Sequence, residues 1–343
     1  MERMLALGII GTGIIAHEHM KAALALHEVK VKAVSNRTLA KALDFAKLYG
    51  IPAQAVYADY RAMLAHERLD AVIICMANHL HEEVFEACAQ AGVAVLLEKP
   101  VAQDSAGCRA INDCAARYGT KLMIGHTQRY QGYYQTAKKI IDSGELGKLI
   151  AIKDSIHYDY FWDGRPAWFL DPDQCGGGIL INYGVHTFDR IQFLSSCRVQ
   201  RVFAHVDWEM DGFQVDSGYQ VQSLHEGGLT SSMTCTGYSG PFHSSTELIF
   251  RHGIMRVFLI GNGLDQEGVW VGRNGQDFQK IPSEKGNAYV RELAAFLAYT
   301  RGEIPCPIDG KYGEDMVLQV EAAYRSHRTG QAENVSTLCQ AQS

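Results

Sequence analysis

The chain has 343 residues, 47% of them hydrophobic and 20% charged, and a formal net charge of −6. This composition predicts a globular protein of two moderate domains, and the acidic balance excludes the basic surface typical of proteins that bind nucleic acid or anionic lipid. No apolar stretch approaches the ~20 residues of a membrane span, and the first residues lack the pattern of a secretory signal. We therefore expect a cytoplasmic protein.

The cysteines and histidines give no indication of a metal centre. The nine cysteines are widely spaced and form no C-x-x-C pair, which favours reduced, mostly buried thiols over disulfides or a zinc site. The H-x-H pairs His17/His19 and His79/His81 have no cysteine or carboxylate at ligand spacing. We predict no metal site.

The first element is a short apolar strand, residues 5–10, which runs into a glycine-rich turn and then a helical pattern. Residues 11–16 form a G-x-G-x-x-A motif, in which Gly11 permits a tight turn, Gly13 leaves room for a pyrophosphate, and Ala16 lets the helix pack closely on the strand. The helix N-terminus would face the phosphates. We assign this loop to a dinucleotide, with the contacts made by Gly11, Thr12, Gly13, Ile14 and Ile15.

Strands and helices then alternate up to about residue 125. The predicted strands are 29–36, 69–77, 93–100 and a strand starting at 121, and the predicted helices between them are 38–50, 81–92 and 105–119. This alternation predicts a parallel sheet with right-handed crossovers. Residues 1–125 are therefore expected to form a Rossmann-type domain.

The remaining chain, 126–343, is richer in strands. A helix over 133–147 precedes β-rich segments at 148–161, 198–210, 217–239, 245–261 and 268–282, and a helical stretch follows the glycines of 176–195. These segments predict an α+β domain with a large, open, mostly antiparallel sheet. Two late helices and a short strand with a frayed end, within 332–343, close the chain, and helix 313–329 is a candidate to pack back on the first domain.

The end of the second strand bears on which dinucleotide binds. NAD-specific folds place an acidic residue there to hold the ribose 2′-hydroxyl, but this chain has Asn36 and Arg37 and no carboxylate before Asp44. Asn36 can bond a hydroxyl or a phosphate, and Arg37 can pair with a 2′-phosphate or stack on adenine. The sequence thus favours NADP over NAD, and use of both stays open.

Several polar and aromatic residues are candidates for the reacting end of the cofactor and for the substrate. Glu98, Lys99 and Pro100 end a parallel strand, at the sheet edge where ligands of open α/β sheets bind. A sugar offers C–H faces to aromatic rings and hydroxyls to polar groups. The candidates are Tyr158, Arg165 and Trp168 in an aromatic-rich segment, Gln128 for the cofactor and Arg129 for the substrate after the last Rossmann strand, and Tyr238.

Six stretches give the chain a family resemblance. They are GIIGTGIIA, LDAVIICMANHLH, LLEKPV, SGELGK, GGGILINYGVH and AAYRSHRTG, and they are spread over nearly the whole chain, from residue 8 to residue 330. With them the chain resembles the glucose–fructose oxidoreductase / inositol dehydrogenase family. The resemblance implies a two-domain NAD(P)-dependent oxidoreductase of sugars, polyols or nucleotide sugars, whose open sheet forms a homo-dimer or homo-tetramer.

The resemblance also implies roles for individual residues. Lys99 matches the family's catalytic lysine and His186 its catalytic histidine, and we expect both to converge on one carbon next to the nicotinamide. The histidine would be the acid/base and the lysine would polarise the reacting oxygen, although the reverse stays open. Ala77, Asn78 and His81 fall on the loop along the cofactor, where the family usually has proline in place of Ala77.

One departure from the family pattern affects the site. The family often has aspartate four residues before the histidine, where this chain has Asn182. On a helix these positions share a face. Asn182 can bond a substrate hydroxyl or Lys99, but it offers no negative charge.

The function expected is hydride transfer between a nicotinamide and a carbinol or carbonyl carbon of a sugar, inositol or related polyol. Three alternatives stay open: a nucleotide-sugar 3-dehydrogenase, a redox-neutral NAD-dependent glycosidase or epimerase of the same fold, and a dinucleotide-binding sensor without catalysis. A small-molecule substrate is expected in each enzymatic case, with no nucleic-acid or membrane partner.

Overall fold

The computed structural model describes residues 3–210, 212–259 and 267–335. The chain divides into two compact units, the first made of residues 1–127 and 287–314 and the second of residues 128–286 and 315–343. The sequence analysis assigned residues 287–314 to the second domain, which it began at residue 126. In the structure, these residues belong to the first unit.

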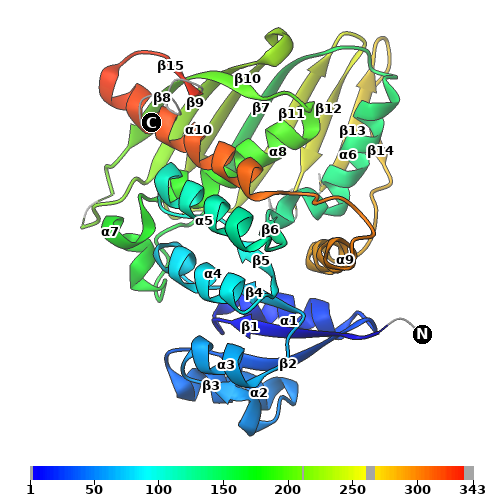
Figure 1. Cartoon of the computed structure of the whole chain (residues 1–343). Helices are drawn as coiled ribbons and strands as arrows, with labels where there is room; N and C mark the ends of the chain where they lie inside the picture. Colours follow the sequence, from blue (N-terminus) through cyan, green and yellow to red (C-terminus); the bar gives the residue numbers. More distant parts are fainter. Residues whose placement is uncertain (1–2, 211, 260–266, 336–343) are drawn as a thin grey trace. The chain divides into compact units, whose positions relative to one another are not determined.

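The first unit is built on a six-stranded parallel sheet in the order β3-β2-β1-β4-β5-β6 (Figure 1). Its strands are β1 (Leu5–Ile10), β2 (Val29–Ser35), β3 (Val56–Tyr57), β4 (Ala71–Ile74), β5 (Ala94–Glu98) and β6 (Leu122–Gly125). Its helices are α1 (Ile14–Leu24), α2 (Leu39–Tyr49), α3 (Tyr60–His66), α4 (His81–Gln90), α5 (Ser105–Tyr118) and α9 (Ala288–Arg301), with the start of α10 (Gly310–Thr329).

The apolar strands predicted from the sequence form the core of this unit. Leu7 and Ile9 of β1, Ile73 of β4 and Leu96 of β5 are fully buried, as expected for strands of a parallel sheet with helices on both faces. The predicted Rossmann arrangement is confirmed.

Hydrogen bonds explain why the distant segment 287–314 belongs to the first unit. The Thr127 hydroxyl donates to Glu292 of α9 at 2.8 Å, and Lys121 donates to the carbonyls of Tyr299 and Thr300. The Ile124 amide bonds the Ile308 carbonyl at 2.9 Å. The segment thus pairs with groups at and beyond the β6 edge.

The second unit carries a nine-stranded sheet in the order β14-β13-β12-β11-β7-β10-β9-β8-β15. Its strands are β7 (Leu149–His157), β8 (Val199–Asp207), β9 (Gly218–His225), β10 (Thr230–Thr236), β11 (His243–Phe250), β12 (Gly253–Phe258), β13 (Gly268–Arg273), β14 (Gln279–Ile281) and β15 (Glu333–Asn334). Its helical elements are α6 (Gly132–Ser143), α7 (Pro172–Cys175), a π-helical turn η5 (Leu180–Gly184), α8 (Val185–Ser195) and most of α10.

Neighbouring strands of this sheet pair antiparallel except for β7 and β10, which are parallel. The predicted open, mostly antiparallel sheet is therefore confirmed. Side chains alternate between buried and exposed along β9 and between buried and half-buried along β11, which is the pattern of a sheet with one covered face. Helices α6 and α8 lie over that face in Figure 1. Of the tail, β15 is present, and residues 336–343 lie outside the described part.

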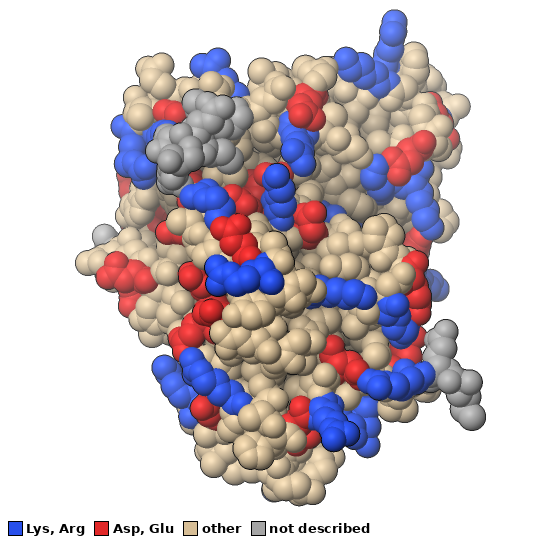
Figure 2. Space-filling model, viewed as in Figure 1, with Lys and Arg blue, Asp and Glu red and all other residues tan. Residues whose placement is uncertain are grey.

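Figure 2 shows acidic and basic side chains interspersed over the visible face. No helix among the described residues is long and apolar enough to span a membrane. The cysteines in the described part of the chain are free thiols.

Candidate functional site

The turn after β1 needs glycine at its first position. Gly11 has φ +91°, and a Cβ there would lie 2.4 Å from the carbonyl oxygen of Cys75. Its amide also bonds the Ser35 carbonyl at the end of β2. The conformation and the contact with the β4 end both exclude a side chain, so this glycine fixes the path of the loop.

Gly13 has a different role. It is the N-cap of α1 without a side-chain cap, and a Cβ placed on it meets nothing within 4 Å. The first turn of α1 carries no acidic residue, and Ile14 and Ile15 are 64% and 39% exposed. The space beside Gly13 is therefore open, and the first turn of the helix adds no negative charge to it. These features fit a pyrophosphate at the helix N-terminus, with the apolar side chains covered by the dinucleotide.

Asn36 links the glycine-rich loop to the end of β2. Its Nδ2 donates to the Thr12 hydroxyl at 2.8 Å, and its Oδ1 accepts from the Thr38 amide at 2.9 Å. Each end of the side-chain amide has one further hydrogen-bonding position, which suits a ribose. Arg37 is exposed beside it. Both residues lie where the sequence places the adenosine end of the cofactor.

The loop after β4 holds the other predicted cofactor residues. Ala77 has φ −66°, the value that proline imposes, so the backbone at this position would accept a proline. Asn78 is buried in the 3₁₀ turn Asn78–Leu80. The fully buried His81 contacts the carbonyls of Met76 and Val101 at 3.1 and 3.0 Å, and burial lowers its pKa. His81 therefore ties the loop to the segment that follows β5.

The carboxyl end of β5 carries a buried dyad next to the predicted catalytic lysine. His19 of α1 is fully buried, and its Nε2 lies 2.8 Å from Glu98 Oε1. Glu98 Oε2 accepts from the Lys99 amide at 3.2 Å. Burial raises the pKa of Glu98, but the bond to His19 and the charges of His19 and Lys99 outweigh it, so the net pKa is lowered. The rings of Tyr289 and His19 pack in a T-shaped arrangement, with their centroids 5.1 Å apart.

This dyad sets the backbone from which Lys99 projects. The lysine is half-buried, and the peptide bond to Pro100 is cis. The helix that begins at the glycine-rich loop is thus joined by one hydrogen bond to the residue preceding the lysine.

In the second unit the π-helical turn η5 and helix α8 carry the remaining polar candidates. Asn182 lies in η5 and donates to the Tyr160 hydroxyl at 3.4 Å, and His186 lies in the first turn of α8. The His186 ring packs edge-on against Tyr183, with centroids 5.6 Å apart. Arg190 follows four residues later, on the same side of the helix.

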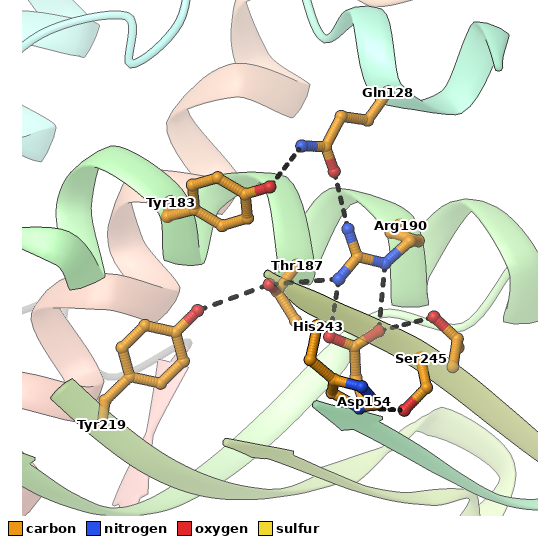
Figure 3. A network of polar contacts seen from close by, with 9 residues as sticks. Gln128, Asp154, Tyr183, Thr187, Arg190, Tyr219, His243 and Ser245 are labelled. Carbon is orange, nitrogen blue, oxygen red and sulfur yellow. Dashed lines mark hydrogen bonds and ion pairs between the residues drawn. The ribbon is translucent and has the colours of Figure 1, made fainter. Parts of the chain in front are cut away.

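A buried network fixes this helix to the sheet (Figure 3). Arg190 and Asp154 of β7 have side-chain exposures of 0% and 1%. Arg190 donates from Nε and Nη2 to the two carboxylate oxygens at 3.0 and 2.6 Å, and from Nη1 to Gln128 Oε1 at 2.6 Å. Asp154 also accepts from the Thr246 hydroxyl at 2.7 Å. The bidentate pair and its neighbours satisfy both charges.

The same network reaches two tyrosines that lie near the candidate residues. Gln128 donates from Nε2 to the Tyr183 hydroxyl at 3.4 Å, and Thr187 contacts the Tyr219 hydroxyl at 3.3 Å (Figure 3). Gln128, assigned to the cofactor from the sequence, thus uses both ends of its amide inside the second unit, and its cofactor contact stays a prediction.

The predicted substrate residues fall into two groups. Tyr158 stacks on Tyr183 with centroids 5.4 Å apart, and Trp168 stacks on Phe169 at 3.7 Å. Together with Arg165, these residues lie in one aromatic cluster with Asn182 and His186. Arg129 and Tyr238 are engaged elsewhere, as the next contacts show.

Arg129 is buried and forms an ion pair with Asp189, with Nε 3.1 Å from Oδ1. Tyr238 donates its hydroxyl to Asp207, and the hydroxyl of Ser217 lies 3.3 Å away. These contacts give both residues partners within the second unit. Their expected contacts with substrate stay predictions.

Sequence reasoning considered His19 only as a metal ligand, and it did not single out Asp154 or Arg190. The available signal was a charged or polar residue inside an otherwise apolar element, as in "IAIKDSIHY" and "FDRIQFL". Such a residue needs a buried partner, but the sequence does not say which one.

Two family models match the chain. The model described as "Oxidoreductase family, NAD-binding Rossmann fold" matches residues 5–126, and the model "GFO/IDH/MocA C-terminal domain" matches residues 134–256. The two matches follow one another in the order that the sequence resemblance implies.

Individual relatives share only a moderate fraction of identical residues with the chain, or match only part of it. The chain is 25% identical to D-glucoside 3-dehydrogenase of Escherichia coli over 95% of its own length and 96% of that protein. It is 36% identical to inositol 2-dehydrogenase of Pseudomonas savastanoi, over 43% of the chain and 44% of that protein. A match to a 1-carboxy-3-chloro-3,4-dihydroxycyclohexa-1,5-diene dehydrogenase of Comamonas testosteroni, at 29% identity, likewise spans about half of that relative, 47%.

A solved structure is also similar in fold. A putative NADPH-dependent oxidoreductase of Desulfitobacterium hafniense superposes with a TM-score of 0.90 at 22% identity, over 98% of this chain and 99% of that one. Such a likeness establishes the fold and leaves the substrate open. With both family models matched in order, the chain belongs to the Gfo/Idh/MocA family of NAD(P)-dependent oxidoreductases, with a NAD-binding Rossmann domain and the family's C-terminal domain.

Proposed function

We propose that this chain is a dehydrogenase or reductase that acts on a CH–OH group of a sugar, an inositol or a related polyol. One observation carries the proposal. The open cradle at Gly13 lies at the start of α1, and the same helix supplies His19, which holds Glu98 beside Lys99. A dinucleotide-binding helix is thus tied to a lysine at the carboxyl edge of the sheet, where such folds place their chemistry.

The relatives named above support the substrate class. The inositol and glucoside enzymes are named for the oxidation of a carbinol carbon on a polyhydroxylated ring. The aromatic cluster around Tyr158 in the second unit offers ring faces, and Asn182 and His186 offer polar groups, which is the combination that a sugar ring needs.

The bound nicotinamide supplies the hydride acceptor or donor. The protein's own task is to move the hydroxyl proton and to stabilise charge on the reacting oxygen. We assign proton transfer to His186 and polarisation of the oxygen to Lys99, and Asn182 binds a substrate hydroxyl or the lysine. In the reverse assignment, Lys99 transfers the proton and His186 polarises the oxygen. The kinetics of single variants of the two residues distinguish the two assignments.

The choice of dinucleotide follows from Asn36 and Arg37. Neither repels a 2′-phosphate, and an exposed guanidinium beside the ribose position can pair with one. We therefore propose NADP as the preferred cofactor, with NAD accepted more weakly. Arg37→Asp should reverse this preference, as measured by the dissociation constants of the two dinucleotides.

The experiment that tests the function is a screen of sugars and inositols for reduced nicotinamide formation with each dinucleotide. Lys99→Met should abolish turnover and leave cofactor binding measurable. Lys47→Met, an exposed lysine in the last turn of α2, is the matched control and should keep full activity. Full activity of Lys99→Met would overturn the site assignment.

We also propose that the exposed face of the nine-stranded sheet forms the homo-oligomer contact, as a dimer or tetramer. Phe203 of β8 and Leu224 of β9 are 47% and 42% exposed there, and both line a hollow of about 600 Å³. Exposed apolar side chains gathered on one face are typical of interaction surfaces. Phe203→Glu should lower the molar mass measured by light scattering. The cytoplasmic location stays a prediction.

A further inference from the structure

The arginine of the aromatic cluster has an unusual environment. The Cζ atom of Arg165 lies 3.7 Å from the ring centroid of Tyr160 and 4.2 Å from that of Phe169. Two aromatic rings therefore hold the guanidinium by cation–π contacts. Tyr160 is itself fully buried, and its hydroxyl donates to the Phe169 carbonyl at 3.3 Å. This frame gives the long side chain a fixed position before any ligand arrives.

Most N–H donors of the Arg165 guanidinium are not used in hydrogen bonds within the described part of the chain. Within the residues that the structure describes, it has no ion pair, and its hydrogen bond is a long one from Nη1 to the Tyr158 hydroxyl, 3.4 Å. Its Nε is buried without a hydrogen-bond partner. Buried N–H groups in folded proteins are almost always bonded, to protein, water or a ligand. The stacking leaves the edge of the planar fork, where its N–H groups point, as the direction from which a partner can approach.

The nearby acidic side chains do not supply that partner. The Asp171 carboxylate caps α7 by accepting from the Asp173 amide at 3.0 Å, and it also accepts from Gln174. Asp163 is exposed, two residues before the arginine. In the described part of the chain, the charge of Arg165 therefore has no ion-pair partner.

The guanidinium is adjacent to the proposed reacting groups of the same unit. Tyr160, on which it stacks, accepts a hydrogen bond from Asn182. Tyr158, to which it donates, stacks on Tyr183, and Tyr183 packs against His186. Two aromatic rings therefore separate the cation from the histidine.

We propose that Arg165 is an anion-binding residue of the substrate site, so that the preferred substrate is a polyol carrying a carboxylate or a phosphate group. The inference rests on the proposed function and narrows its substrate class. A carboxylate and a phosphate share the chemistry that a guanidinium fork recognises, with paired oxygens accepting parallel N–H bonds. A neutral sugar would leave the cation unpaired in a partly buried site, which is unfavourable.

The test compares compounds that differ only in the anionic group. We would measure dissociation constants by calorimetry on the cofactor-loaded enzyme for D-glucose, D-glucuronate and D-glucose 6-phosphate, and for myo-inositol and its 1-phosphate. The variants are Arg165→Gln, Arg165→Lys and, as a charge-matched control on an exposed turn of the same unit, Arg251→Gln.

The expected result is that an anionic member binds at least about tenfold more tightly than its neutral partner. Arg165→Gln should abolish this preference, Arg165→Lys should retain part of it, and Arg251→Gln should keep all of it. Preference for the uronate identifies a carboxylate as the source, and preference for the phosphates identifies a phosphate. The inference is overturned if no anionic member is preferred, including the case of no binding, or if Arg165→Gln keeps the preference.

Failure of this inference and failure of the proposed function give different results. If neutral polyols are oxidised but no anionic member binds more tightly than its neutral partner, the function stands and the anion subsite is refuted. If an anionic ligand binds through Arg165 but no polyol of either charge is oxidised, the subsite stands and the dehydrogenase proposal fails.

Discussion

The buried ion pair between Arg190 and Asp154 provides a sharp test of how the second unit is held together. Asp154→Asn keeps the shape of the side chain, removes its charge and turns an N–H donor toward the guanidinium. The arginine would then lose one of its two carboxylate contacts, at 3.0 and 2.6 Å, in a site where both side chains are at most 1% exposed.

The cost follows from the uncompensated charge. Burial lowers the pKa of Arg190, but the charges of Asp154 and of nearby tyrosines raise it by a larger amount. The net pKa is therefore raised, and the side chain stays charged. Breaking a buried pair on one side costs about 3–5 kcal/mol of unfolding free energy. For a unit of this size that corresponds to a fall in melting temperature of roughly 10 °C.

The four tryptophans make the assay specific to this unit, because Trp162, Trp168, Trp208 and Trp270 all lie within it. Urea unfolding followed by tryptophan fluorescence therefore reports on the unit that carries the mutation. Asp142→Asn, at an exposed ion pair with Lys138, is the matched control and should cost less than about 1 kcal/mol.

The double variant Asp154→Asn with Arg190→Met removes both charges. Since replacing both partners of a buried pair is often close to neutral, it should be more stable than Asp154→Asn alone. A loss below about 1 kcal/mol for the single variant, or a double variant that is less stable than the single one, would refute this reasoning.

Three other predictions concern single positions. Gly13→Ala should weaken dinucleotide binding by about tenfold or more without changing the melting temperature. Gly11→Ala should destabilise the fold by roughly 1–3 kcal/mol, because its Cβ would clash with a carbonyl oxygen. Equal melting temperatures of the two variants would contradict this contrast. If Lys99 has the role proposed for it, Asn182→Asp should shift the alkaline limb of the pH–rate profile upward by favouring the charged form of that lysine. An unchanged profile in an active variant would exclude this coupling. Burial raises the pKa of Asp207, but bonds from Tyr238 and other donors lower it below its usual value. This carboxylate therefore stabilises the fold fully above its unfolded pKa, and the contribution is lost as pH falls through the folded pKa. Tyr238→Phe should lower the urea midpoint more at pH 7 than at pH 3, and an equal deficit at both would contradict it.

The parts of the fold that depend on local sequence were predictable. The glycine-rich turn after an apolar strand, the alternation of strands and helices, and the change to β-rich texture all follow from nearest-neighbour preferences and periodicity. They gave the Rossmann sheet and the open second sheet. The segment 287–314 was not placed, because its helix pattern is typical of any amphipathic helix and its partners, Lys121 and Thr127, lie far away in the sequence.

The candidate site was predictable only where a residue type is itself distinctive. A lysine followed by proline at a strand end, or a histidine after a triple glycine, is visible in the sequence. The pairing of His19 with Glu98 spans 79 positions and that of Arg190 with Asp154 spans 36. Which buried charges meet is decided by tertiary packing, so the sequence alone marks such residues only as unusual. The stacked environment of Arg165 depends in the same way on how its aromatic segment folds back on itself.

The central claim is that the protein moves hydride between a carbinol carbon and the dinucleotide. Polyols deuterated at the carbinol carbons, incubated with the enzyme and either dinucleotide, test it directly by mass spectrometry of the recovered cofactor and product. We predict that deuterium from one carbon appears on the nicotinamide ring, and that the transfer is lost in Lys99→Met. Recovery of unlabelled cofactor across the whole panel, from protein that binds the dinucleotide normally, would contradict the account.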